Sequence, residues 1–253
     1  MGEHIARATP TKKKSSNIFW NIVGVIGELL ITFAFVIGLF SVWQLYWTTY
    51  EVAGQVSQTI ASYEEEHQPS KRTLGEVRTD DPPAFDREVG DGEVYGLVHV
   101  PTWDWMKIPL AEGTTSYVLD QGWAGHYDMT TQPGGVGNFS VAGHRRTYGN
   151  NFRWIDRLTQ GDKVVVEVDD HYLVYSMVSS EIIDATDPTQ MRVVAPVIDD
   201  VSWSETPTER WMTMTTCHPE YGNWQRYIVH LKFESWTPKD TGVPAELVDE
   251  PTN

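Results

Sequence analysis

Residues 211–233 read WMTMTTCHPEYGNWQRYIVHLKF and contain the only cysteine of the chain, Cys217. Before the cysteine, apolar Met212 and Met214 alternate with Thr213 and other polar residues, which is the period of a β-strand. After a loop at 218–225, a second alternating run begins at Arg226. If the apolar rows of both strands face a core, the thiol and the guanidinium share the opposite face at one mouth of the sheet. The stretch therefore predicts a strand pair that carries a reactive site.

A third segment, 138–144 (NFSVAGH), follows the same logic. Phe139 and Val141 are expected to point inward and His144 outward. A cysteine thiolate is a nucleophile, a histidine can pass a proton to a leaving amine, and an arginine can donate hydrogen bonds to an oxyanion. A lone cysteine is more often a small buried hydrophobe. The coincidence of all three groups on one predicted face favours catalysis.

The motifs around these residues resemble those of the sortases, the cysteine transpeptidases of Gram-positive cell surfaces. The sequence TMTTC at 213–217 is followed by HP and by an arginine nine positions after the cysteine, and AGHR lies upstream at 142–145. Met214 stands where the family motif has leucine. The resemblance implies that Cys217 is the nucleophile, His144 the general acid/base, and Arg226 the group that positions substrate and stabilises the oxyanion.

The tripeptide Gly125-His126-Tyr127 narrows the resemblance to the class E sortases of actinobacteria. In that class a tyrosine here is thought to favour alanine over proline at the second position of the sorting signal. The alternative, that Tyr127 simply packs on the sheet, stays open. Tyr127, Thr215 and Thr216 are the candidate substrate-binding residues.

Composition excludes several other functions. The net charge of −16 argues against a nucleic-acid partner, which would require a basic stripe. One cysteine excludes an internal disulfide. The histidines show no ligand-spaced cluster, so we expect neither a metal nor another cofactor. The aromatic content of 12% fits a β-rich domain.

The N-terminal region predicts a membrane anchor. A basic tail at 1–17 precedes an apolar run at 18–47, which is longer than the roughly 20 residues that a spanning helix needs. The basic tail predicts a cytoplasmic N-terminus and an extracytoplasmic remainder, in a single-pass protein of the cell membrane. Glu28 is explained by protonation, by a position near the inner interface, or by a partner helix that carries a complementary polar group. A cleaved signal peptide is the alternative to an anchor.

The remaining boundaries follow from composition. We expect a juxtamembrane helix and a Pro- and charge-rich linker at 48–91, a catalytic barrel at 92–236 and a disordered acidic tail at 237–253. The linker motif DDPPAFD has Pro83 where pilus-building sortases have a lid aromatic, so no lid is expected. The predicted fold is mostly β, a closed barrel of about eight strands with short helices. The expected strands are 93–100, 105–108, 138–144, 163–168, 171–183, 211–217 and 226–236, with helical turns at 115–119 and 151–158.

The leading functional hypothesis is a membrane-anchored transpeptidase. By resemblance, it cleaves an LPxTG- or LAxTG-like signal on secreted proteins through an acyl-enzyme on Cys217 and transfers them to an amine of cell-wall precursor. The second hypothesis is a membrane-tethered peptide-binding module on the same barrel without turnover. A papain-like peptidase is disfavoured because its nucleophile precedes its histidine in the chain, whereas His144 precedes Cys217.

Overall fold

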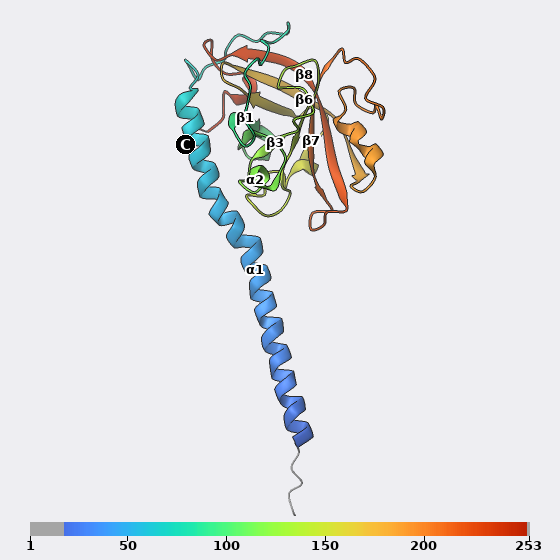
Figure 1. The fold of residues 1–253 in the computed structure, drawn as a ribbon. Helices are drawn as coiled ribbons and strands as arrows, with labels where there is room; N and C mark the ends of the chain where they lie inside the picture. Colours follow the sequence, from blue (N-terminus) through green and yellow to red (C-terminus); the bar gives the residue numbers. More distant parts are fainter. Residues whose placement is uncertain (1–17, 252–253) are drawn as a thin grey trace, which may run out of the picture. The chain divides into compact units, whose positions relative to one another are not determined.

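The computed structural model describes residues 18–251, so the predicted cytoplasmic tail at 1–17 lies outside the described residues. The first element, α1, is a helix from Ile18 to Glu66 (Figure 1). Its part Phe19–Trp43 has a mean hydropathy of 2.4 and is long and apolar enough to cross a membrane. The chain divides at Trp43 into two compact units, and the second, from Gln44 onward, contains the β-domain.

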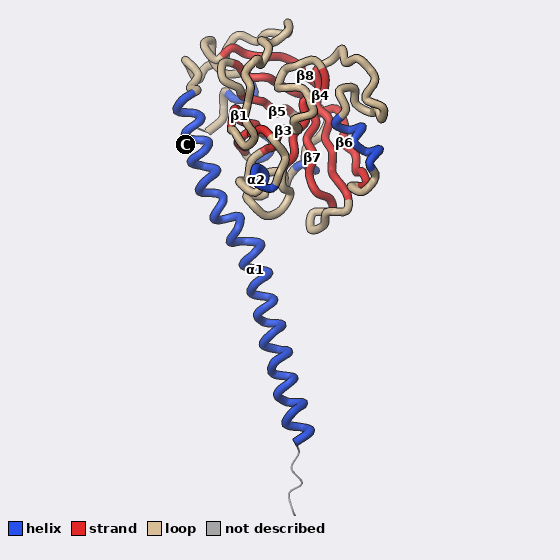
Figure 2. The backbone as a smooth tube through the Cα atoms, in the orientation of Figure 1, coloured by secondary structure: helices blue, strands red, loops and turns tan. Residues whose placement is uncertain are grey.

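Eight strands form a closed barrel in the order β1-β2-β3-β4-β7-β8-β6-β5 (Figure 2). The strands are β1 (Val94–Val100), β2 (Met106–Glu112), β3 (Ala124–His126), β4 (Gly137–Ala142), β5 (Lys163–Glu167), β6 (His171–Asp184), β7 (Arg210–His218) and β8 (Gln225–Pro238). The short helices are α2 (Ser116–Leu119), η1 (Pro101–Trp103), η2 (Ile155–Arg157), η3 (Pro188–Val194) and η4 (Ala245–Leu247). The predicted mostly-β closed barrel is confirmed. The strand β3 was not predicted, because its three residues are too few to show an alternating pattern.

The barrel interior is filled by the apolar rows that the sequence indicates. Met212 and Met214 of β7 and Val229 and Leu231 of β8 are all fully buried in one core cluster. Phe139 of β4 belongs to the same cluster. Because side chains alternate along a strand, burying these rows fixes which face each neighbouring residue occupies.

The opposite face of β4 and β7 is also buried, which differs from the solvent-facing position that the alternation predicts. Thr213 is fully buried, and the end of the η3 segment lies against Asn138 on this face of the sheet. The amide of Asn138 donates hydrogen bonds to the carbonyls of Val193 and Ala195 at 3.1 Å each. Asn138, on the polar face of β4, is therefore hydrogen-bonded to the η3 segment that covers it, as is usual for buried polar groups.

The prediction of a disordered C-terminal tail is wrong for the part that the structure describes. Val243 and Leu247 are each 2% exposed and pack on Val165, Tyr172 and Val174 of β5 and β6. These strands are apolar on both faces, so their outer face needs a cover, and the tail provides it.

The region predicted as a linker is also docked in part. Leu74 forms a parallel bridge with Val243, and Arg78 an antiparallel bridge with Trp236. The guanidinium of Arg78 also lies 4.7 Å from the centre of the Trp236 ring. These contacts fasten residues 74–78 to the barrel, so that part of the segment is not a free spacer.

Candidate active site

Cys217 and Arg226 lie directly opposite each other on the antiparallel strands β7 and β8. Cys217 is half-buried, while Met212 and Met214 of the same strand are fully buried in the core. The Nη1 atom of Arg226 donates hydrogen bonds to the carbonyls of Asn223 and Gln225, at 2.7 and 2.9 Å. The strand register thus places Arg226 opposite Cys217, and backbone carbonyls at the start of β8 and just before it hold its guanidinium.

His144 follows β4, the strand that runs parallel to β7 on its other side. The N–H of Gly143 donates to the carbonyl of Thr215 at 3.1 Å, and the hydroxyl of Thr216 donates to the carbonyl of Gly143 at 2.7 Å. The residue before His144 is therefore hydrogen-bonded to the two residues before Cys217. These bonds bring the histidine and the cysteine to the same end of neighbouring strands.

Glycine is required at position 143. A Cβ atom there would lie 2.8 Å from ring atoms of Phe152, a buried core side chain. The N–H of Phe152 also donates to the carbonyl of His144 at 3.0 Å. Close packing of this ring against the backbone holds the His144 loop in place.

The side chains of Asp120 and Tyr148 contact the imidazole of His144. Its Nε2 lies 2.7 Å from Oδ1 of Asp120, and its ring faces Tyr148 with the ring centres 5.3 Å apart. Asp120 follows α2, and nothing in its local sequence distinguished it as a site residue. Its role could not be predicted from the sequence, because the contact joins residues 24 positions apart.

Tyr127 follows β3 and lies close to the same strand end. Its hydroxyl is hydrogen-bonded to that of Thr215 at 2.9 Å. Burial raises the pKa of Tyr127, while the Thr215 hydrogen bond and the positive charge of Arg226 oppose this shift. The phenol therefore lies within electrostatic range of both Arg226 and Cys217. Of the three candidate substrate-binding residues, Tyr127 and Thr215 form a pair, whereas the Thr216 hydroxyl is engaged with the Gly143 backbone.

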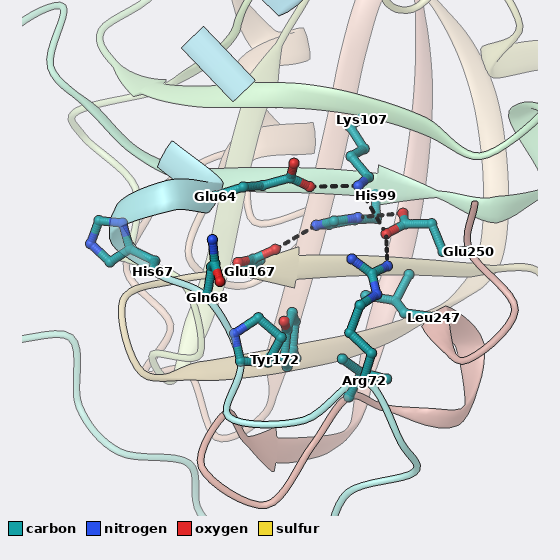
Figure 3. Close-up of a pocket in the computed structure, with 12 residues that line it drawn as sticks. Glu64, His67, Gln68, Arg72, His99, Lys107, Glu167, Tyr172, Leu247 and Glu250 are labelled. Carbon is teal, nitrogen blue, oxygen red and sulfur yellow. Dashed lines mark hydrogen bonds and ion pairs between the residues drawn. The ribbon is translucent and has the colours of Figure 1, made fainter. Parts of the chain in front are cut away.

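A separate polar cavity of about 240 Å³ lies on another part of the domain (Figure 3). It is lined by Glu64, His67, Gln68, Pro69, Arg72, His99, Lys107, Glu167, Tyr172, Val243, Leu247 and Glu250. His99 bridges Glu167 and Glu250 at 2.8 Å on each side, and Lys107 bridges Glu64 and Glu250. This ionic cluster joins the end of α1, the barrel and the C-terminal segment, and none of the three catalytic candidates lines the cavity.

Comparisons with known proteins agree with the fold described above. The sortase-domain family model matches residues 98–234. The chain is 36% identical over 229 residues to sortase SrtE1 of Streptomyces coelicolor, covering 88% of this chain and 60% of that protein. It is 31% identical over 223 residues to sortase SrtE2 of the same organism, covering 86% of this chain and 84% of that protein.

Solved structures give the same result. The SrtA sortase from Actinomyces oris is 43% identical with a TM-score of 0.64, covering 70% of this chain and all of that one. Sortase E1 from Streptomyces coelicolor, solved with a tripeptide in its active site, is 37% identical with a TM-score of 0.55. The match covers 63% of this chain and 99% of that one.

The chain therefore belongs to the sortase family, whose members are cysteine transpeptidases. The class E resemblance inferred from residues 125–127 is confirmed by the two Streptomyces relatives. The match spans 60% of the length of SrtE1.

Proposed function

We propose that this chain is a membrane-anchored transpeptidase that cleaves an LPxTG- or LAxTG-like sorting signal and transfers the secreted protein to an amine of cell-wall precursor. The observation that supports this most directly is the pairing of Cys217 with Arg226 across β7 and β8, with the His144 loop hydrogen-bonded to the same end of β7. A half-buried cysteine paired across two strands with an arginine suits nucleophilic catalysis.

The proposed reaction has two halves. The Cys217 thiolate attacks the carbonyl carbon of the signal threonine, and Arg226 donates hydrogen bonds to the resulting oxyanion. The C–N bond to glycine then breaks as His144 gives its proton to the leaving amine, which leaves a thioester. An incoming amine attacks this thioester, returns a proton to His144 and releases the thiolate, so the catalyst is regenerated.

The test uses the full chain in detergent micelles with a library of pentapeptide signals and a soluble amine, and mass spectrometry of the products. We expect a peptide joined to the amine through its threonine, and a thioester on Cys217 as the intermediate. Cys217→Ala must abolish both products. Met214→Leu, which restores the family residue on the buried face of the same strand, serves as the matched control and should remain active. Continued cleavage by Cys217→Ala would refute the mechanism.

Peptide binding without turnover is the outcome that favours the binding-module alternative. In that case wild-type protein binds the signal but forms no thioester and releases no glycine-containing fragment. Labelling by a thiol-reactive mimic of the signal separates the two functions, because a binding module needs no reactive thiolate.

We further propose that residues 18–47 anchor the chain in the cell membrane with residues 1–17 in the cytoplasm. The apolar segment Phe19–Trp43 and the basic residues before it support this orientation. Protease treatment of intact cells should remove the barrel and spare an N-terminal tag. Removal of the tag from intact cells would reverse the proposed orientation.

A further inference from the structure

The proposed reaction assigns no step to Asp120, which contacts His144. Nε2 of His144 and Oδ1 of Asp120 are 2.7 Å apart, and the two side chains are 26% and 34% exposed. A carboxylate only accepts hydrogen bonds, so the imidazole must donate from Nε2. Within residues 18–251, the second ring nitrogen, Nδ1, has no hydrogen-bond partner, and His144 is the one side-chain partner of Asp120.

Asp120 is held on a segment other than the His144 loop. It follows α2, and its N–H donates to the carbonyl of Ser116 at 2.9 Å. Val118 of α2 is fully buried in the domain. The backbone of Asp120 is therefore anchored on the β2–β3 connection, and its carboxylate accepts a hydrogen bond from Nε2 at the edge of the imidazole ring.

The face of the imidazole is supported separately. Tyr148 lies against His144 with an angle of 30° between the ring planes. A ring contact of this kind limits tilting but leaves the ring free to exchange its two nitrogens by rotation. The Asp120 hydrogen bond removes that freedom, because it favours a proton on the nitrogen that faces the carboxylate.

We propose that Asp120 is a positioning residue, which fixes the orientation and tautomer of His144 so that Nδ1 is the atom that exchanges protons with the reacting amines. This inference rests on the proposed function. Nε2–H stays bonded to Asp120 throughout, while Nδ1–H supplies the proton to the leaving amine and the bare Nδ1 takes one from the incoming amine. In other enzymes too, one nitrogen of a catalytic histidine is bonded to an orienting group while the other exchanges protons.

Asp120 is also a practical target for substitution. A partly exposed ion pair adds little to folding stability, so a variant that lacks it should fold. Asp128 provides a matched control, because it is exposed on the loop after β3 and carries the same charge. Loss of either carboxylate changes the net charge equally, but only Asp120 contacts His144.

The first measurement is steady-state kinetics of the full chain in micelles with a signal peptide and a soluble amine. Asp120→Ala should lower kcat by about 10- to 100-fold with KM changed by less than about twofold, the usual cost of losing such a supporting contact. Added formate should restore part of kcat in Asp120→Ala, because it can occupy the vacated carboxylate position, and should not do so in His144→Ala. Asp128→Ala should match wild type. A kcat of Asp120→Ala within about twofold of wild type would overturn the proposal, as would the absence of rescue by formate.

The second measurement needs no peptide and so separates this inference from the proposed function. Alkylation of Cys217 by iodoacetamide is followed from about pH 5 to about pH 9, the range in which an imidazole and a thiol titrate. Asp120→Ala should change the shape of the rate profile, and Asp128→Ala should not. If wild type turns over no peptide, the proposed function fails while this profile still decides the role of Asp120. Identical profiles for wild type and Asp120→Ala would refute that role.

Discussion

Arg145 donates a hydrogen bond from Nη1 to Nδ1 of His218 at a distance of 2.8 Å. Arg145 directly follows His144, and His218 directly follows Cys217, so this bond ties together the two segments that carry the proposed acid/base and nucleophile. His218 must be neutral to accept it. The pKa of His218 is lowered accordingly, first by burial and then by the charge of Arg145.

Replacing Arg145 with methionine should therefore weaken the link between the two segments, which the hydrogen bonds at Gly143 still join. The Arg145 side chain is 4% exposed and also pairs with Asp156 at 2.8 Å. We expect kcat to fall by roughly 10- to 100-fold and stability by about 1–3 kcal/mol, the usual cost of breaking a buried hydrogen-bonded charge contact. Arg146→Met is the neighbouring control, because that side chain is 30% exposed and pairs with Glu220 on the loop after β7. Equal effects of the two substitutions on kcat would contradict the proposed link.

Arg226 should not be replaceable by lysine. Its Nη1 donates hydrogen bonds to the backbone carbonyls of Asn223 and Gln225. These two bonds fix the plane of the guanidinium and thereby the directions of its other N–H groups. Lysine has a point charge on a flexible stem and cannot reproduce this geometry. We expect Arg226→Lys to lower kcat by about 100-fold or more, the effect of losing an oxyanion donor. Arg210→Lys, at the other end of β7, is the control, and a comparable loss there would point to a general effect on the strand pair.

The sequence was sufficient to predict the barrel because its strands alternate strongly. The rows Met212/Met214 and Val229/Leu231 have period 2, and their burial follows from pattern alone. The pairing of Cys217 with Arg226 also follows, since two strands joined by a short loop are adjacent and antiparallel. The side-chain partners could not be predicted in this way.

The contacts that the sequence did not reveal join segments that are distant along the chain. Asp120 meets His144 and Arg145 meets His218 only because the closed barrel brings β3, β4 and β7 together. The ordered tail was missed for a related reason. Its charged and proline-rich composition is typical of disorder, whereas Val243 and Leu247 find an apolar surface that exists only after β5 and β6 have formed.

Tyr127 should influence which residue is accepted at the second position of the signal. Its hydroxyl is hydrogen-bonded to Thr215, two residues before Cys217, so it is held close to the proposed nucleophile. A phenol oxygen held in this position can accept a hydrogen bond from a backbone N–H of the signal peptide. Proline has no such N–H. We expect Tyr127→Phe to lower the ratio of kcat/KM for an alanine signal over a proline signal by about tenfold, because loss of one hydrogen bond of a specificity site has this order of effect. Competition between the two peptides measures the ratio directly. An unchanged ratio would support the alternative that Tyr127 only packs on the sheet.

The buried cluster around His99 should make folding stability depend on pH. Both ring nitrogens of His99 lie 2.8 Å from a carboxylate, of Glu167 and of Glu250, so both act as donors and the ring is protonated. Burial alone lowers the pKa of His99, but the two hydrogen-bonded carboxylates outweigh it and raise the pKa to about 9. Figure 3 shows these contacts at the wall of the polar cavity.

A raised pKa means that the folded state binds the proton more tightly than the unfolded state does. The stabilisation is therefore complete below the unfolded pKa of about 6.5 and is lost as the pH rises towards about 9. Its size is on the order of 3 kcal/mol. Melting of the full chain in micelles, followed by tryptophan fluorescence, should show a falling midpoint over this interval. His99→Gln should lower the midpoint at neutral pH and flatten the dependence, because the titrating group is gone. His67→Gln, at the same cavity, is the control and should keep the slope. A slope between pH 6.5 and 9 that survives in His99→Gln would assign the dependence to another group.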